Sequence, residues 1–363
     1  MYIDTHTHHM PRPYITQVME DPDRFKAVVQ EESKDVFDLR PSFWSSARFA
    51  SSYRLDPTYY DWAARIAHMD AQGIRLSVVS ANQALNYGWA PLDVAIEVAR
   101  IINDDLAEGS RRYPNRIVGV ASVPLQDAES AIAEARRAVD DLGLRGIQVL
   151  SSIEGVNLVD AGLDALFECV AGLGVPLFVH PYGALNHDRM TRHFLVNVIG
   201  FPAEQAMVAA GLVFEGVLDR YPDLRVFLGH GGGVFPYVLG RIERGMRAFP
   251  DLMHARRPLR SYLTQFYVDT LVHDDTALAY LIETVGIEQV VVGTDWPYWM
   301  QDPDMLDRVG RVLAASGVEP NVLSQNAERL FGEPSDYTPI GPDPASAARS
   351  LRHSQSESTD INE

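Results

Sequence analysis

The chain has 363 residues, of which 46% are hydrophobic, so it can bury the core of one large domain. Its formal net charge of −18 and pI near 5.0 argue against nucleic acid and anionic membranes as partners. The single cysteine, Cys169, excludes an internal disulfide. No secretory signal and no apolar run of membrane-spanning length is evident, so we expect a cytoplasmic protein.

The chain begins with a short predicted strand, residues 1–8, that ends in two histidines. Residues 9–60 follow with many aromatic side chains and no clear period, which indicates a long, irregular insertion rather than regular elements. Structureless segments of this length inside a compact domain are usually functional. We therefore expect the insertion to lie over the mouth of the fold that the rest of the chain builds.

From residue 61 the pattern alternates regularly between strands and helices. Together with residues 1–8, the predicted strands are 76–80, 116–123, 146–150, 175–180, 224–230, 266–269 and 290–293. The predicted helices are 61–72, 92–107, 128–142, 163–173, a helical region ending near 222, 237–246, 275–285, 303–315 and 320–331.

Eight strands that alternate with helices predict an α/β fold, a (β/α)₈ TIM barrel, over residues 1–335. A doubly wound open sheet is the alternative, but no G-x-G-x-x-G motif follows the first strand. Residues 336–363 are rich in Pro, Ser, Asp and Ala, which predicts a flexible, solvated tail.

Metal-competent side chains stand at the ends of four predicted strands. His6 and His8 are two residues apart, so an extended strand turns both to one face; His180 and His230 each end a strand, and Asp295 follows the last one. A single histidine or aspartate in such a place is usually a packing or capping residue. In a barrel, however, all these strand ends meet at one mouth, and together they indicate a metal centre with catalytic function.

These segments resemble the metal-dependent amidohydrolase superfamily, in particular its 2-amino-3-carboxymuconate-6-semialdehyde decarboxylase-like branch. The motifs that carry the resemblance are IDTHTH (3–8), MDAQG (69–73), VPLQD (123–127), FVHP (178–181), GHGGG (229–233) and GTDWP (293–297). The resemblance implies that His6, His8, His180 and Asp295 hold one divalent ion. Zn²⁺ is the first expectation and Mn²⁺ the second. His230 would act as acid or base, with Asp295 also catalytic.

The lysine content bears on the number of ions. Two-metal members of the superfamily bridge their ions with a lysine at the end of the fourth strand, but the chain has only Lys26 and Lys34, neither of which lies near residues 146–150. If that strand is assigned correctly, a lysine-bridged pair is excluded, and one ion is expected.

The resemblance also suggests residues that bind a substrate carboxylate. Arg241, eleven residues after His230, stands where the related enzyme contributes an arginine to a neighbouring subunit, which implies a homodimer. A solvated surface charge is the alternative interpretation of Arg241. A second arginine is expected in the insertion, either Arg48 or Arg54, and His193 or Phe194 stands where the family has an aromatic lining residue.

The leading hypothesis is therefore a metal-dependent, non-oxidative decarboxylase of a small aromatic or muconate-like carboxylic acid. The alternative is a hydrolase or hydratase of a lactone, amide or unsaturated diacid, in which an activated water attacks carbon. A descendant that only binds a ligand is less favoured, because every ligand position is filled.

Overall fold

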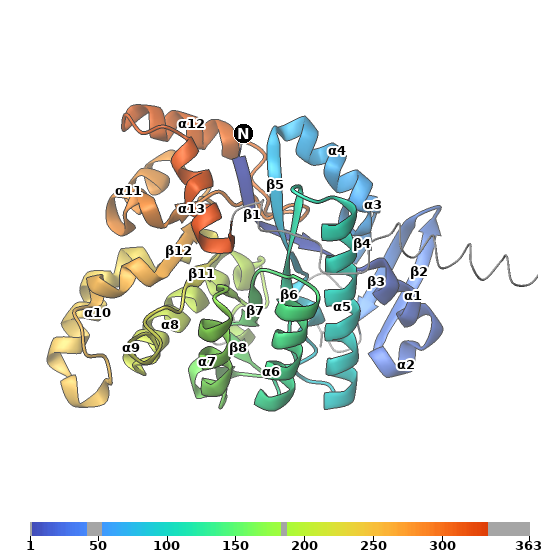
Figure 1. The fold of residues 1–363 in the computed structure, drawn as a ribbon, viewed down its shortest axis with the longest axis horizontal. Coiled ribbons are helices and arrows are strands. Elements are labelled where there is room, and N and C mark those ends of the chain that lie inside the picture. Colours follow the sequence, from blue (N-terminus) through green and yellow to red (C-terminus); the bar gives the residue numbers. More distant parts are fainter. Residues whose placement is uncertain (1, 42–52, 183–186, 333–363) are drawn as a thin grey trace, which may run out of the picture.

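The computed structural model describes residues 2–41, 53–182 and 187–332. Within these ranges the chain forms a barrel of parallel strands surrounded by helices (Figure 1). The tail predicted over 336–363 and the candidate residue Arg48 lie outside the described residues.

All eight predicted strands are present and form one sheet in the order β1-β5-β6-β7-β10-β11-β12-β13. They are β1 (Tyr2–His9), β5 (Ile74–Ala81), β6 (Ile117–Ser122), β7 (Ile147–Leu150), β10 (Leu177–His180), β11 (Val226–Leu228), β12 (Phe266–Asp269) and β13 (Val290–Val291). Each neighbouring pair is parallel. The assignment of β7 as the fourth strand supports the argument against a lysine-bridged pair of metal ions.

The barrel closes between its first and last strands. Two isolated parallel bridges join Asp4 to Val292 and Thr7 to Trp296. The backbone N–H of Thr5 donates to the carbonyl of Val292, and that of His8 donates to the carbonyl of Trp296, each at 2.8 Å. This closure confirms the predicted (β/α)₈ barrel and rules out an open doubly wound sheet.

The outer layer consists of helices that follow the strands along the chain. They are α4 (Trp62–Gln72), α5 (Leu92–Arg112), α6 (Ala128–Arg136, extended by a π turn over Arg137–Asp141), α7 (Asp164–Leu173), α8 (Phe201–Phe214), α9 (Val217–Arg220), α10 (Phe235–Ala248), α11 (Asp275–Val285), α12 (Met305–Ala315) and α13 (Asn321–Phe331). Aspartates begin several of them: Asp61, Asp127 and Asp274 accept hydrogen bonds from backbone N–H groups in the first turns of α4, α6 and α11.

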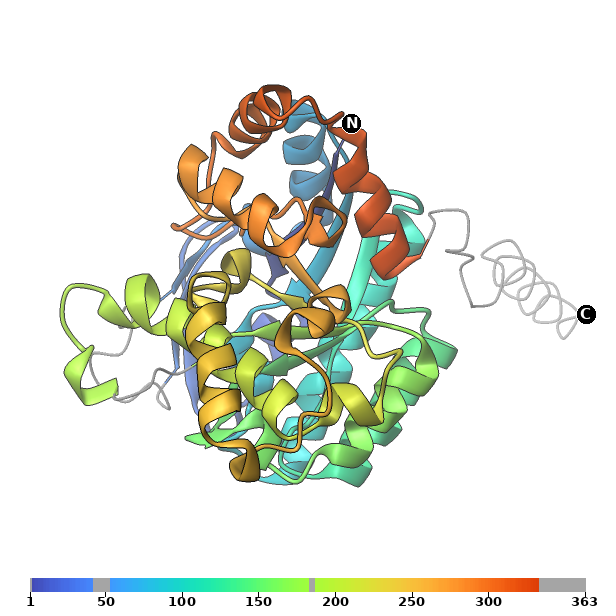
Figure 2. The ribbon, with the colours of Figure 1, turned by 90° about the vertical axis from the view of Figure 1, so that its left-hand side faces the viewer.

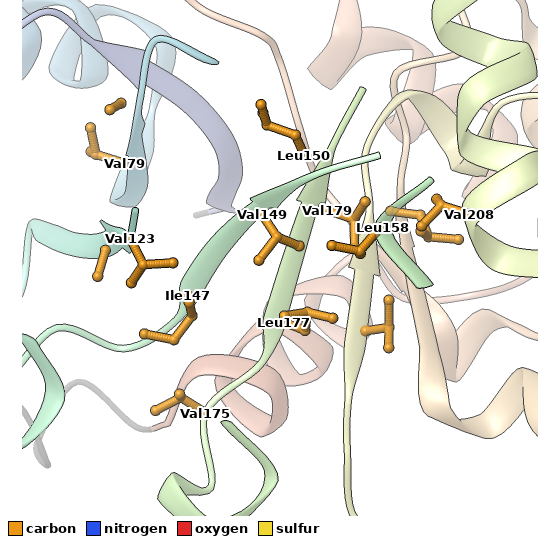
Figure 3. Close-up of a cluster of buried hydrophobic side chains, with 14 of the residues drawn as sticks. Val79, Val123, Ile147, Val149, Leu150, Leu158, Val175, Leu177, Val179 and Val208 are labelled. Carbon is orange, nitrogen blue, oxygen red and sulfur yellow. The ribbon is translucent and has the colours of Figure 1, made fainter. Parts of the chain in front are cut away.

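Two hydrophobic layers hold the barrel together. The larger lies between strands and helices; Figure 3 shows part of it, with Ile147 and Val149 of β7 beside Leu177 and Val179 of β10. The smaller fills the barrel and includes Ile3, Leu76, Val78, Val118, Val120, Phe178, Phe227, Tyr267 and Val291, together with Ala327, Leu330 and Phe331 of α13. Because alternate strand residues face opposite sides, a single strand supplies both layers.

The sequence pattern predicts an irregular insertion after β1, but the structure shows regular elements in it. It contains α1 (Arg12–Glu20), α2 (Pro22–Phe25) and α3 (Pro57–Tyr60), with an antiparallel sheet of β2 (Ala27–Ser33), β3 (Val36–Pro41) and β4 (Tyr53–Leu55). These elements form a lobe beside α5 (Figure 1). The pattern was hard to read because helices of four residues and exposed strands give no sustained period. A second small hairpin, β8 (Ser152–Ile153) with β9 (Val156–Asn157), follows β7.

One helical stretch is more apolar than the sequence analysis recognised. Val196–Phe214, which joins a π turn (Val196–Gly200) to α8, has 19 residues and is long and apolar enough to cross a membrane by length and composition alone. The expectation that no apolar run reaches this length was therefore wrong. Buried core helices meet the same criterion, and 56% of this stretch is buried inside the fold. Figure 2 shows the segment before α8 projecting from the barrel.

Candidate metal centre

Five predicted side chains meet at the carboxyl ends of the strands. The ring centroid of His6 lies 5.0 Å from that of His8, 5.4 Å from that of His180 and 5.1 Å from that of His230. The candidate ligand atoms of His6, His180, His230 and Asp295 all lie within 4.8 Å of one another, and Nε2 of His8 lies 3.0 Å from Oδ1 of Asp295. The barrel therefore brings together all the residues predicted from the strand ends.

Three of the histidines direct the same nitrogen toward the centre. Nδ1 of His6 lies 2.6 Å from Oδ2 of Asp269, Nδ1 of His180 donates to the Pro181 carbonyl at 2.8 Å, and Nδ1 of His8 lies 3.1 Å from the Ser80 hydroxyl. Metal-binding histidines are commonly oriented in this way by a partner on the other ring nitrogen.

The atoms turned inward are unsatisfied. Nε2 of His6, His8 and His180 and Oδ1 of Asp295 are all buried, and among the described residues none has a hydrogen bond of regular geometry. Buried polar atoms without partners are costly, so their convergence requires a compensating group. Three imidazole nitrogens and one carboxylate oxygen are a ligand set suited to a single divalent cation.

His230 differs from the other three histidines. Its buried nitrogen without a partner in the described residues is Nδ1 rather than Nε2. It does not extend a strand, because its φ is +56° and the three following glycines also have positive φ. This turn presents the imidazole to the centre with a buried Nδ1 that has no hydrogen-bond partner in the described residues, so this nitrogen is available to exchange a proton with a substrate.

Asp269 is an organising residue of this centre that the sequence analysis did not single out. It ends β12 and is fully buried. Besides the contact with His6, its carboxylate accepts from the backbone N–H groups of His230 at 3.1 Å and Gly231 at 2.7 Å. It thus links the β1 histidine to the loop that carries His230. The rule used for Asp295, an acidic residue closing a buried strand, would also have identified Asp269.

Two glycines are required by the close packing around His6. A Cβ at Gly229 would lie 2.7 Å from Cε1 of His6, and a Cβ at Gly293 would lie 2.7 Å from Cβ of Asp269 and 2.8 Å from Cβ of His6. Real Cβ atoms do not approach other atoms this closely. The glycines in GHGGG and GTDWP therefore make room for the imidazole.

Burial controls the protonation of the histidines. It lowers the pKa of His230 to about 4, lowers the pKa of His8, and lowers that of His180 well below its usual range. Burial also acts to lower the pKa of His6, but the Asp269 carboxylate outweighs it and the pKa is raised. For Asp295, burial acts to raise the pKa, but the neighbouring histidines outweigh it and lower the pKa. Neutral imidazoles beside a carboxylate are the form that binds metal ions.

A cavity opens directly above the centre. Its walls combine aromatic rings with two amides: Tyr53, Gln83, His180, Phe194, Asn197, Phe201, His230, Asp295, Tyr298, Trp299 and Met300. The Tyr298 ring lies 4.7 Å from the His8 ring, and its buried hydroxyl has no partner in the described residues. Most of these lining residues come from loops after the strands, which the periodicity of the sequence does not place.

Of the predicted substrate-binding residues in the described parts of the chain, most do not line the cavity. Arg54 does not line the cavity: its Nε lies 3.2 Å from Oε2 of Glu32 on the solvent side. Alternation along β4 turns Tyr53 inward and Arg54 outward. Of the two aromatic alternatives, Phe194 lines the cavity and His193 is exposed. Arg241 is exposed on α10, and no arginine or lysine lines the cavity within the described parts of the chain.

Comparisons with known proteins agree with this geometry. A family model described as "Amidohydrolase" matches residues 3–332. A 2-amino-3-carboxymuconate-6-semialdehyde decarboxylase of Dictyostelium discoideum is 36% identical, over 78% of this chain and 80% of the relative. A gamma-resorcylate decarboxylase of Rhodococcus jostii is 32% identical, over 64% and 76%.

A solved structure is also similar. 5-Carboxyvanillate decarboxylase of Novosphingobium aromaticivorans, complexed with manganese and 4-hydroxy-3-methoxy-5-nitrobenzoic acid, has a TM-score of 0.75 and 26% identity. The match covers 92% of this chain and 96% of that one. The likeness therefore extends through the whole barrel.

Proposed function

Because the chain belongs to the amidohydrolase family, we propose that it is a metal-dependent, non-oxidative decarboxylase of a small aromatic or muconate-like carboxylic acid. The convergence of buried, unpartnered ligand atoms below an aromatic cavity is the observation that carries the proposal. Relatives named for decarboxylation of 2-amino-3-carboxymuconate-6-semialdehyde and of gamma-resorcylate support this choice of reaction.

The proposed metal ligands are His6, His8, His180 and Asp295. Each histidine offers a buried, inward-facing Nε2, and Asp295 offers Oδ1. In His230 the buried nitrogen without a partner in the described residues is instead Nδ1. The ion is one Zn²⁺ or Mn²⁺ per chain, and manganese is the metal bound in the similar carboxyvanillate decarboxylase. When bound, such an ion supplies a Lewis acid that polarises the substrate carboxylate and a neighbouring oxygen.

The chain's own residues perform the rest of the reaction. The aromatic walls of the cavity, with Phe194, Phe201 and Tyr298, hold a flat substrate and exclude water. The bond between the ring or chain carbon and the carboxylate breaks, CO₂ leaves, and the electron pair stays on that carbon. The carbon then takes up one proton, which His230 or Asp295 takes from a solvent water and passes on.

A substrate panel tests the proposed reaction. The protein is stripped of metal, reloaded with Mn²⁺ or Zn²⁺, and supplied with 2,6-dihydroxybenzoate, 5-carboxyvanillate and 2-amino-3-carboxymuconate-6-semialdehyde, while CO₂ is measured. We expect CO₂ release from at least one acid, only after reloading. A parallel panel of lactones, amides and unsaturated diacids, followed by acid release or hydration, is the counter-test. Turnover there without any CO₂ release would establish the hydrolase or hydratase alternative instead.

We also propose that two copies associate through α10. Four exposed apolar side chains, Val198, Ile199, Val234 and Tyr237, are 43%, 55%, 41% and 80% exposed. The two pairs adjoin, because the N–H of Val234 donates to the carbonyl of Pro202 at the start of α8. Contiguous exposed apolar surface favours a protein interface. Arg241 lies one helical turn beyond Tyr237, so it would stand at this interface.

Subunit mixing tests the role of Arg241. If Arg241 acts in the partner's cavity, Arg241→Ala and His6→Ala chains should each be inactive, and mixed dimers should regain part of the activity, since each mixed dimer keeps one intact site. Arg112→Ala, an exposed arginine on α5, is the matched control and should remain fully active. Proven subunit exchange without recovered activity would contradict the proposal, and an active Arg241→Ala protein would return Arg241 to the role of a solvated charge.

A further inference from the structure

A fully buried arginine lies behind the strand that carries His6 and His8. Arg65, on α4, is 1% exposed. Its guanidinium donates from Nη1 to Oγ1 of Thr7 at 2.9 Å and from Nη2 to the carbonyl of His8. Within the described part of the chain, these hydrogen bonds go to a hydroxyl and a backbone carbonyl rather than to a carboxylate.

The burial of this guanidinium costs free energy of folding. Removing a guanidinium from water is costly, and a buried charge normally lies against an opposite charge. Burial lowers the pKa of Arg65 to about 9, against the charge of Asp4, which acts to raise it. Nε of Arg65 is buried without a hydrogen-bond partner among the described residues. An apolar side chain would fill the same volume at less cost, so the directed donors of Arg65 need an explanation.

Arg65 contacts both sides of the seam where the barrel closes. Thr7 lies on β1 between the two candidate ligand histidines, and the guanidinium carbon lies 4.5 Å from the centroid of the Trp296 ring, which directly follows Asp295. The backbone carbonyl of Trp296 accepts a hydrogen bond from the backbone N–H of His8. The Trp296 ring also stacks on the His68 ring, with 4.6 Å between the ring centroids.

The seam is joined by separate backbone hydrogen bonds and isolated bridges rather than by a continuous ladder. β13 contributes only Val290 and Val291 as a strand, and beyond them β1 and the last segment are joined by isolated bridges. At this level one ligand, His8, belongs to the first strand and another, Asp295, to the segment after the last. Their facing atoms are 3.0 Å apart. Backbone hydrogen bonds from the Asp295 N–H to the His6 carbonyl and from the His8 N–H to the Trp296 carbonyl, each at 2.8 Å, join the two segments here, and the side-chain contacts of Arg65 act on the same two segments.

We propose that Arg65 is a positioning residue that holds His8 and Asp295 at metal-binding distance, because it contacts both β1 and Trp296. It touches neither the ion nor a substrate. Its Nη1 and Nη2 donate to Thr7 and to the His8 carbonyl, and its guanidinium carbon lies over the Trp296 ring. The inference rests on the proposed metal centre and adds a residue behind it.

Metal affinity of the stripped protein tests the inference without an activity assay. Arg65→Lys keeps the positive charge but loses the paired Nη1 and Nη2 donors of the guanidinium. Arg65→Met keeps a long buried side chain without the charge. Residues that orient metal ligands typically contribute about 10–100-fold to metal affinity. We expect both variants to bind Mn²⁺ more weakly by this factor in calorimetric titration, and the electron paramagnetic resonance spectrum of the bound Mn²⁺ to change.

The sign of the effect separates positioning from simple electrostatics. A guanidinium that acted only by its positive charge would repel the ion, so Arg65→Met would then bind Mn²⁺ more tightly. Thr7→Val, which removes one acceptor of the guanidinium and keeps the side-chain shape, should shift the affinity in the same direction as Arg65→Lys. It also serves if Arg65→Met does not fold, as judged by circular dichroism.

Arg116→Met is the matched control, because this partly buried arginine bonds to the Arg75 carbonyl and to Asp70 near the amino end of β5, away from the cavity. It should bind Mn²⁺ as the wild-type protein does, even if its melting temperature falls. If folded Arg65→Lys and Thr7→Val proteins have the Mn²⁺ affinity and spectrum of the wild type, the positioning role of Arg65 is overturned, while the proposed metal centre stands. A wild-type protein that binds no divalent ion would instead overturn the proposed metal centre.

Discussion

Replacing His230 with alanine is expected to leave the metal ion bound and to lower kcat by about 10²–10⁴-fold, the usual contribution of a general acid or base. The expectation follows from the difference between the ring nitrogens. Nε2 of His6, His8 and His180 is free and buried, and Nδ1 of each is held by a partner, whereas the buried free nitrogen of His230 is Nδ1 and no bond orients it in the described residues. Nδ1 of His230 is therefore available to exchange a proton with a bound substrate.

The measurement combines metal analysis with steady-state kinetics on the same preparation. His254→Ala is the matched control, since the His254 side chain is 73% exposed and lies 3.3 Å from Glu215 far from the cavity lining. It should keep full activity and full metal content. If His230→Ala protein instead loses its ion along with its activity, His230 belongs to the ligand set, as its position within 4.8 Å of the other candidate atoms allows.

Replacing His6 with alanine should abolish both metal binding and activity. The wild-type chain is expected to carry about one ion, and His6 occupies the middle of the group, with its ring edge against the Phe178 and Phe227 rings at 5.8 and 5.9 Å. Removing one of four ligands leaves a buried cavity lined by the remaining unsatisfied atoms. Metal analysis after gel filtration checks the result. A His6→Ala protein that retains a full equivalent of metal would exclude His6 as a ligand.

Asp269→Asn provides the graded counterpart, since it changes only the partner of His6. The amide keeps the shape but lacks the charge and one acceptor oxygen, so either the His6 ring or a backbone N–H of the His230 loop loses its bond. Metal affinity should fall by about 10–100-fold without total loss. Asp70→Asn, on the exposed surface of α4, is the control for the same chemical change. Unchanged metal affinity in Asp269→Asn would show that the aspartate serves the loop alone.

The sequence by itself determined the barrel and the metal-competent residues. Unbroken apolar runs such as 290–292 predict strands covered on both faces, and several of the predicted strands end at or just before a histidine or an aspartate. Parallel strands in a barrel share one mouth, so the proximity of His6, His180, His230 and Asp295 follows from local pattern and one topological rule.

Only the tertiary structure decided the walls of the cavity and the contacts behind the strands. Tyr53, Gln83 and Tyr298 reach the cavity from loops and short elements whose direction no periodic pattern encodes, and Phe201 reaches it from the first residue of α8. The same limit explains Arg54, whose outward direction depends on the pairing of β4 with β3. Arg65 illustrates it most clearly. As an arginine on a predicted helix it would be expected in solvent, and only the closure of β1 against the last strand buries it beside His8 and Trp296.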